Sequence, residues 1–299
     1  MARPPGGFAD LDGTALDMSP RPSERLTLTV LAILLCLDCL ARPGGWGPSA
    51  LTLASMLLAQ ALLTGAPGKG ALGVLRDFAP VVAVLGTFLL LQPLVAAVNP
   101  LRFDALLAQA DARWLGDLAL RWRGAFGRPS AFTDLVYLAY ASFYFLPLTV
   151  AILARVRLDA ARFEPMAFTL LLGFYLSFLG YFLCPAEGPR IPQVLEATQL
   201  GGGPLAAGVR AFLHHAERTT LDAFPSGHTQ LSLLAVVLAA RPFPRLVPLL
   251  ALWALAIIFA AVYISAHYVV DVLAGAVLVP LTWLLAPHAS RLMGRLPDS

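Results

Sequence analysis

Eight long apolar runs constrain the fold of this chain more than any other feature of its sequence. A helix crosses the hydrocarbon core of a bilayer in about 20 mostly apolar residues, and each run approaches that length. Lipid offers the backbone no hydrogen-bond partner, so only helices or closed barrels span it, and no alternating strand pattern occurs here. The predicted spans are Leu26–Ala41, Ser49–Gly65, Ala79–Val98, Thr133–Ala154, Pro165–Cys184, Gly227–Ala240, Pro244–Ser265 and His267–Ala286.

The composition excludes a soluble globular protein. Of the 299 residues, 58% are hydrophobic and 13% are charged, whereas a soluble domain carries about a quarter charged residues. The net charge of +3 is spread over short loops, so we expect no nucleic-acid partner. Cys36 and Cys39 lie inside an apolar run, where two thiols are more typical of packing than of redox chemistry.

Two long segments between the runs are not predicted to span the membrane. Arg102–Gly127 mixes apolar and charged residues near helical spacing. We predict an amphipathic helix in the membrane interface, with Trp114 and Trp122 at headgroup depth; a solvated connecting helix is the alternative. Pro185–Phe224 is predicted to be a polar loop rich in glycine and proline.

The Lys and Arg residues predict the orientation of the chain. Twelve fall on the side of the N-terminus and nine on the opposite side, where five of the nine lie in or beside the interfacial segment. Because cytoplasmic loops carry the excess of positive residues, both termini are predicted to be cytoplasmic. Residues 1–25 lack the features of a secretory signal and are predicted to be a flexible cytoplasmic tail.

Three polar clusters fall on the non-cytoplasmic side of this topology. They are Pro185–Arg190, Ala223–Thr229 and Ser265–Asp271. Polar residues at membrane depth are unfavourable and are typical of functional sites. Their common side therefore predicts one site assembled from all three clusters.

The first two clusters contain residues that suit phosphate chemistry. Ser226 and Gly227 open a predicted helix, whose free N–H groups can bind an anion, and glycine lets the backbone come close. His228 follows in the first turn, where it can give or take a proton near neutral pH. Arg190 can bind phosphate oxygens with two parallel hydrogen bonds.

The third cluster contains a histidine and a carboxylate on one helix face. His267 and Asp271 are spaced i, i+4. A carboxylate in that place can hold the imidazole in one tautomer and raise its nucleophilicity. Two alternatives remain open from the residues alone: a structural hydrogen bond between helices, or zinc ligation by the two histidines and the aspartate.

The second and third clusters resemble a known family. Phe224-Pro-Ser-Gly-His228 and His267-Tyr-Val-Val-Asp271-Val-Leu-Ala-Gly275 are similar to motifs of the type-2 phosphatidic acid phosphatase superfamily, over roughly Thr133 to the C-terminus. The resemblance implies a six-helix core formed by the third to eighth spans, the third matched by position only. It also implies a reaction without metal or cofactor.

The resemblance assigns a role to each matching residue. His267 attacks phosphorus and forms a phosphohistidine, Asp271 orients it, and His228 protonates the leaving group. Arg190, Ser226 and Gly227 hold the phosphate. The catalytic membrane domain then covers residues 131–287, after an N-terminal part at 26–130, and a cytoplasmic tail follows at 288–299.

The sequence departs from the usual pattern at positions that bind phosphate. Leu183 stands where the first motif has a lysine, and Ala260 and Ala261 stand where the third motif has serine and arginine. A relaxed pattern of this kind resembles the branch that contains inositol phosphorylceramide synthase, whose members transfer head groups through phosphodiesters. A diester carries one negative charge, so fewer cations suffice.

The short sixth span supports a lipid substrate. From Gly227 to Ala240 it measures roughly 21 Å at 1.5 Å per residue, less than a core about 30 Å thick. The end that carries His228 would lie below the headgroup plane, where a lipid phosphate can reach it from the side. Asp134, Tyr137 and Tyr268 are further candidates to line that approach.

Three functions are therefore considered. The first is an integral membrane lipid phosphatase with water as acceptor. The second is a head-group phosphotransferase with an alcohol acceptor such as inositol. The third is a transporter, which is disfavoured because the polar residues cluster at one membrane face, whereas transporter sites lie near the midplane.

Overall fold

The chain is all-helical wherever its structure is described. The computed structural model describes residues 19–42, 47–68, 70–114, 116, 118–126, 130–189, 201–216 and 220–294, and this part contains no strand, which confirms the predicted fold class. All eight predicted spans are helical. Five described helices are long and apolar enough to cross a membrane: Gly70–Val98, Ser130–Arg157, Ala160–Leu183, Pro244–Tyr263 and Val269–Gly294.

The remaining predicted spans are shorter or more polar. Pro48–Thr64 and Gly227–Ala239 are apolar helices of fewer than 18 residues. The helix Pro22–Ala41 has 20 residues but is not among the five; it contains Glu24, Arg25 and Asp38. By length and composition alone, five of the eight predicted spans are described helices long and apolar enough to cross a membrane, and the other three are helices at the positions that the apolar runs predicted.

The chain divides into two compact units, of which the first is formed by residues up to Thr87 together with the segment from Ala289 onward. It contains α1 (Pro22–Ala41), α2 (Pro48–Thr64) and the first part of α3 (Gly70–Val98). A buried ion pair and a buried hydrogen bond hold these helices. Arg76 Nε donates to Glu24 Oε1 at 2.6 Å, and Ser49 Oγ donates to the buried Asp38 at 2.8 Å. Helix α1 begins at Pro22, inside the predicted tail, and residues 1–18 lie outside the described residues.

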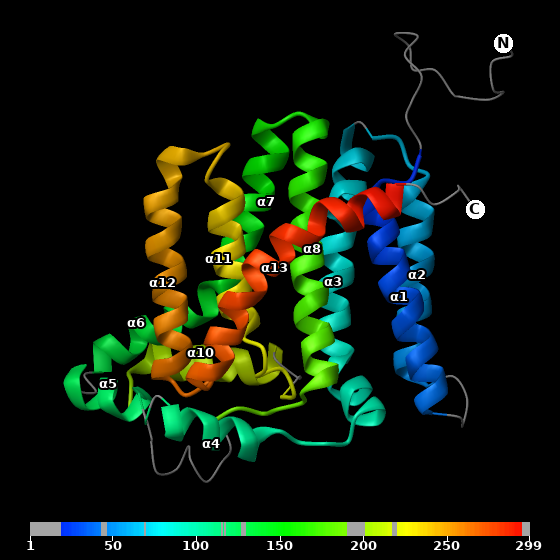
Figure 1. Cartoon of the computed structure of the whole chain (residues 1–299). Helices are drawn as coiled ribbons and strands as arrows, with labels where there is room; N and C mark the ends of the chain where they lie inside the picture. Colours follow the sequence, from blue (N-terminus) through cyan, green and yellow to red (C-terminus); the bar gives the residue numbers. More distant parts are fainter. Residues whose placement is uncertain are drawn as a thin grey trace, which may run out of the picture. The chain divides into compact units, whose positions relative to one another are not determined.

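The second unit, Phe88–His288, holds the predicted functional residues (Figure 1). This unit includes the end of α3 and most of α13 (Val269–Gly294). Its other helices are α4 (Asp104–Trp114), α5 (Leu118–Phe126), α6 (Ser130–Ala141), η1 (Ser142–Tyr144), α7 (Phe145–Arg157), α8 (Ala160–Leu183), α10 (Pro204–Ala216), α11 (Gly227–Ala239), η2 (Pro244–Leu246) and α12 (Val247–Tyr263). In Figure 1, α4, α5 and α10 lie across the end of this unit where α11 begins.

Helix α11 is the centre of this unit, packed against α7, α8 and α12. Its Leu231, Leu234 and Leu238 are buried in one apolar core. In contrast to these buried side chains, Leu249 and Leu252 on the outward face of α12 are 64% and 66% exposed. Large apolar side chains on an outer surface are expected where lipid is the solvent. The arrangement places the first turn of α11, and thus His228, within a bundle of apolar helices.

The predicted fourth span contains a local change of helix type. Between α6 and α7 the chain makes the short 3₁₀ helix η1, which begins at Ser142. Ser142 Oγ donates to the Ala139 carbonyl oxygen at 2.6 Å and accepts from Trp253 Nε1 at 2.7 Å. A side chain that engages the helix backbone and a neighbouring helix is a common cause of such a break.

Two predicted connecting segments have more structure than their sequences indicated. The predicted loop Pro185–Phe224 contains α10, which starts at Pro204, a favoured first helical residue. The predicted interfacial helix is two helices, α4 and α5. Gly116 lies between them with a φ of 61°, a backbone conformation that suits glycine. Local composition missed α10 because its helix depends on packing against α6, which is distant in sequence.

Candidate active site

His228 is the second residue of α11 and lies between two aromatic rings. Ser226 is the N-cap of the helix, and its Oγ accepts from the Thr229 backbone N–H at 3.3 Å. The His228 ring is stacked on Tyr140, with centroids 4.4 Å apart, and its centroid lies 4.3 Å from that of Phe143. The negative faces of aromatic rings favour a nearby cation. An imidazolium at His228 would therefore contact two aromatic rings.

His267 lies in the tight turn between α12 and α13. Its backbone N–H and that of Ala266 both donate to the Ala261 carbonyl oxygen, at 3.1 and 2.9 Å. Its Nδ1 atom lies 2.9 Å from the Ala223 carbonyl oxygen. Because a carbonyl oxygen can only accept, Nδ1 carries the proton and Nε2 keeps its lone pair. The fold thus holds His267 in the tautomer whose Nε2 atom can act as a nucleophile.

The two histidines contact each other directly. Nε2 of His267 lies 3.3 Å from Nδ1 of His228, although the residues are 39 positions apart in the sequence. Both rings are buried, with exposed fractions of 3% for His267 and 8% for His228. Burial strengthens electrostatic interactions, because the surroundings screen charge less than water does. The structure therefore brings the second and third predicted clusters into one buried site.

Asp271 lies in the first turn of α13, close to His267 but not hydrogen-bonded to it. Its Oδ2 atom accepts from the Tyr268 backbone N–H at 2.8 Å and lies 3.6 Å from His267 Nδ1, which is longer than a hydrogen bond. The predicted orienting bond to His267 is made instead by the Ala223 carbonyl oxygen. Asp271 contributes a fully buried carboxylate close to the imidazole.

Ser226 and Gly227 are held in close backbone contacts with neighbouring helices. The Ser226 N–H donates to the Asp271 carbonyl oxygen at 3.0 Å. A Cβ atom on Gly275 would lie 2.4 Å from the Ser226 carbonyl oxygen, and one on Gly227 would lie 2.6 Å from Tyr181 Oη. Both glycines therefore allow helices to approach more closely than any side chain would. The contacts of Ser226 and Gly227 with phosphate stay a prediction.

Asp134 and Tyr137, two of the candidates for substrate access, lie where α6 meets α10. Asp134 Oδ1 accepts from the backbone N–H groups of Gly203 and Ala206, at 2.7 and 2.9 Å. These bonds cap the start of α10. Tyr137 is buried, and the Arg210 guanidinium lies 5.1 Å from the centre of its ring. Both side chains fix α10 over α6 at the end of the bundle that carries the site.

Tyr268, the third candidate, follows His267 directly and is half-buried. Burial, together with the carboxylates of Asp104, Asp271 and Asp111, raises the pKa of its phenol to about 12. The phenol is therefore neutral at physiological pH and can donate a hydrogen bond.

Arg190, the predicted phosphate clamp, lies outside the described residues.

Three contributors to the site were not predicted. Tyr140 and Phe143 contact His228, and the Ala223 carbonyl oxygen holds His267. The two aromatic residues follow Tyr137 at intervals of three, which places all three near one helix face. That spacing was a usable signal. The Ala223 carbonyl left no signal in the sequence, because every residue has one.

A sequence model of the PAP2 superfamily matches residues 105–285, more than half of the chain. The chain belongs to the PAP2 superfamily. The match runs from α4 to α13, so it includes His228, His267 and Asp271, and it begins earlier than the expected boundary at Thr133. No significant match to a curated protein or to a solved structure was found.

The positions that depart from the usual PAP2 pattern have different surroundings. Leu183 is 65% exposed on the last turn of α8, whereas Ala260 and Ala261 are fully buried. A different cation reaches the turn before His267. Arg123 of α5 is 3% exposed, and its Nε and Nη2 atoms donate to the Tyr263 carbonyl oxygen at 2.8 and 2.7 Å. This arginine lies outside the motifs, in the predicted interfacial segment.

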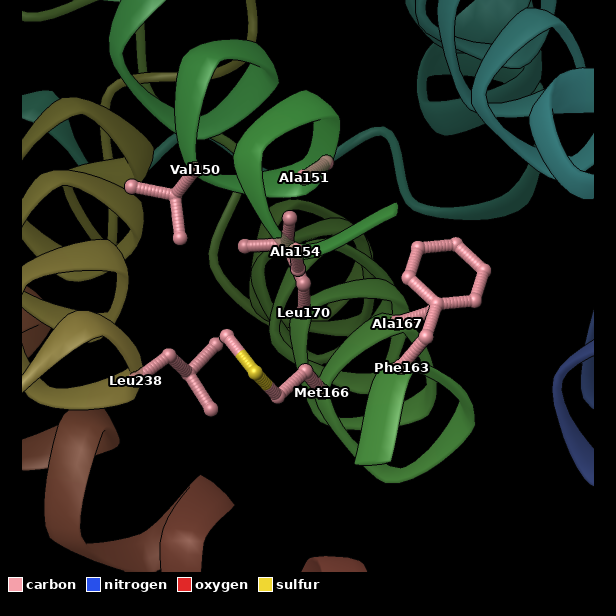
Figure 2. A pocket seen from close by; sticks show the side chains of 8 residues that line it. All are labelled: Val150, Ala151, Ala154, Phe163, Met166, Ala167, Leu170 and Leu238. Carbon is pink, nitrogen blue, oxygen red and sulfur yellow. The ribbon is translucent and has the colours of Figure 1, made fainter. Parts of the chain in front are cut away.

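An apolar pocket is lined by residues of α7, α8 and α11 (Figure 2). Leu238 on its wall is ten residues after His228, or about 15 Å along α11 at 1.5 Å per residue. The lining residues carry no titratable side chain: Val150, Ala151, Ala154, Phe163, Met166, Ala167, Leu170 and Leu238. This pocket therefore cannot supply acid, base or nucleophile to a reaction.

Proposed function

We propose that this PAP2 protein cleaves a phosphate ester of a membrane lipid through a phosphohistidine at His267. The observation that carries the proposal is the 2.9 Å contact between Nδ1 of His267 and the Ala223 carbonyl oxygen. The Nδ1 proton is directed at the Ala223 carbonyl oxygen, so the lone pair of Nε2 faces the His228 ring at 3.3 Å. A nucleophile beside a proton carrier is the arrangement that covalent catalysis requires.

In the first step, Nε2 of His267 attacks phosphorus while the bond from phosphorus to the leaving oxygen breaks. Protonated His228 gives its proton to that oxygen, so the leaving group departs as an alcohol. The imidazole of His267 then carries a positive charge. Its Nδ1–H is bonded to the Ala223 carbonyl oxygen, and the Asp271 carboxylate at 3.6 Å stabilises the new charge.

In the second step, His228 acts in its neutral form. It removes a proton from an incoming hydroxyl group, whose oxygen attacks phosphorus and breaks the bond to Nε2 of His267. Water as acceptor releases the phosphate group, and an alcohol as acceptor forms a new phosphate ester. The two histidines serve both outcomes, so the acceptor distinguishes a phosphatase from a phosphotransferase.

A lipid substrate is supported by the position of the site among apolar helices. His228 is in the first turn of α11, a helix with apolar neighbours on three sides. The outer residues of α12 expose leucine side chains, as expected for contact with lipid tails. A phosphate attached to a lipid would stay at this depth, whereas a free sugar phosphate would have to leave water.

The second candidate function is transfer of a phosphoryl head group between lipids. The buried Ala261 and the exposed Leu183 favour it, because they stand where the usual PAP2 pattern has an arginine and a lysine and so leave the site with fewer cations. A phosphodiester carries one negative charge and needs fewer of them than a monoester dianion. An alcohol such as inositol, in free or lipid-bound form, would then replace water.

An assay with phosphorus-labelled lipids separates these functions. We expect kcat/KM for a diester lipid to exceed that for a monoester lipid by about 10- to 100-fold, since one missing charged hydrogen bond is worth about 1.5–3 kcal/mol. Purified protein would be incubated with each lipid, with and without inositol. Label in a new inositol ester formed only when inositol is added indicates a transferase. Label released to water, as inorganic phosphate from the monoester or as the head-group phosphate from the diester, indicates a phosphatase. Faster turnover of the monoester would contradict the charge argument.

We also propose that the site faces away from the cytoplasm, as the distribution of Lys and Arg predicts. Single cysteines would replace Gly201, before α10, and Arg241, at the opposite end of α11, after removal of Cys36, Cys39 and Cys184. Both positions are exposed, and a Cβ at Gly201 meets no atom within 4 Å.

In intact cells, an impermeant thiol reagent is expected to label the cysteine at position 201 at once and the cysteine at position 241 only after permeabilisation. The reverse pattern would place the histidines on the cytoplasmic side and both termini outside. Equal labelling of the two positions would show that the cells are leaky, and the total after detergent lysis corrects for expression.

A further inference from the structure

Helix α4 (Figure 1) belongs to no motif, but it shares a buried cluster with one residue from each of the three predicted clusters. Asp104, Leu107 and Asp111 lie on one face of the helix, at spacings of three and four residues. Leu107 is 6% exposed. It lies in a buried cluster with one residue from each of the three segments that form the site: Ala186, Ala223 and Val270.

Asp111 fixes the segment that carries His267. Its Oδ1 atom accepts from the Val270 backbone N–H at 3.0 Å, in the first turn of α13. Val270 is three residues after His267. A carboxylate at a helix N-terminus satisfies a free donor and interacts favourably with the helix dipole. Asp111 therefore determines where α13 begins relative to α4, and with it the position of His267.

Asp104 acts on the same imidazole through a chain of backbone bonds. Its Oδ1 atom accepts from the N–H groups of Glu187 and Gly188, both at 2.9 Å. The carbonyl oxygen of the preceding residue, Ala186, accepts from the Ala223 N–H at 3.1 Å. The Ala223 carbonyl oxygen in turn holds Nδ1 of His267 at 2.9 Å.

We propose that α4 positions the nucleophile, with Asp104 and Asp111 as positioning residues of the reaction. This inference rests on the proposed function. Nucleophile and phosphorus must meet within about 3–3.5 Å on a defined line, and a misplacement of about 1 Å costs about 100-fold in rate. Neither aspartate touches the substrate in this scheme. Their loss therefore lowers the rate of phosphoenzyme formation and leaves substrate affinity nearly unchanged.

The test compares Asp111→Ala with a matched variant, Asp159→Ala. Asp159 also caps a helix, since its Oδ1 atom accepts from the Arg162 N–H at 2.9 Å, but it lies at the start of α8, the end of that helix remote from the site. Both variants lose a helix cap and are expected to lose thermal stability. Only Asp111→Ala is expected to lower kcat, by about 10- to 100-fold, with KM within about twofold of the wild type.

A conservative variant separates positioning from folding. The side-chain oxygen of Asp111→Asn can still accept from Val270 N–H, so this variant is expected to recover most of the kcat that alanine loses. Wild-type kcat in Asp111→Ala would overturn the proposal. An equal loss of kcat in Asp159→Ala, in parallel with its thermal stability, would also overturn it, because the effect would then belong to folding.

Failure of the proposed function would be visible in the wild type, as no turnover of any monoester or diester lipid. The positioning role is then tested without substrate, by ¹⁵N NMR of histidine-labelled protein, with the His267 signals assigned through His267→Ala. The wild type is expected to show the Nδ1-protonated form of His267. Asp111→Ala and Asp104→Ala are expected to shift that signal, and Asp159→Ala is not. An unchanged His267 signal in both α4 variants would refute the positioning role by itself.

Discussion

His267→Ala is expected to remove the covalent phosphoenzyme and essentially all turnover. Nε2 of His267 is the atom that bonds phosphorus in the proposed reaction, and no other described side chain can take its place beside His228 and the Ala223 carbonyl oxygen. The measurement is rapid mixing with a phosphorus-labelled lipid, acid-free quenching and gel analysis, since a phosphohistidine is lost in acid and survives in base. Wild-type protein should retain the label and the variant should not.

The control for this result is His288→Ala, which changes an exposed histidine on α13. It is expected to form as much phosphoenzyme as the wild type. Asp271→Asn is a second comparison: because the Ala223 carbonyl oxygen still holds Nδ1, the phosphoenzyme should form, but slowly, without the carboxylate charge. Acid-labile label on His267→Ala protein would show that another residue is the nucleophile.

His228→Ala is expected to slow the first step by about 10²- to 10⁴-fold for a natural lipid ester, the usual contribution of general acid catalysis. A lipid alkoxide is a poor leaving group and needs a proton as it departs. An aryl phosphate with a nitrophenol leaving group needs none, so the same variant should retain much of the wild-type rate with it. The measurement is the ratio of the two rates in wild-type and variant protein.

Two outcomes would contradict this role for His228. An equal loss for both leaving groups would mean that His228 holds the phosphate or the fold rather than donating a proton. A missing phosphoenzyme in His228→Ala, with a normal one in His267→Ala, would exchange the roles of the two histidines. The variant Tyr140→Leu offers a further check of this role. It removes the aromatic ring stacked 4.4 Å from the His228 ring and keeps His228 itself as the acid.

The sequence by itself determined the fold class and the residues with chemistry. Long apolar runs predict helices in lipid, because backbone N–H and C=O groups there can form hydrogen bonds only with other backbone groups of the protein. Ser226 before Gly227 predicts a helix start, and α11 begins at Gly227 with Ser226 as its cap. The spacing of His267 and Asp271 predicted one helix face, but α13 begins only at Val269, so His267 lies in the turn before the helix that carries Asp271. Such features are local, because they depend on residues a few positions apart and not on how the helices pack.

Only the tertiary structure decided which atoms meet in the site. The sequence pairs His267 with Asp271, but the bond to Nδ1 comes from the Ala223 carbonyl oxygen, 44 positions away. The aspartate that caps α13 comes from α4, 159 positions before Val270. A backbone carbonyl has no signature in a sequence, and an aspartate on an amphipathic helix is indistinguishable from a solvated one. Such contacts depend on how helices pack, because distance in space, not distance along the chain, determines which donor meets which acceptor.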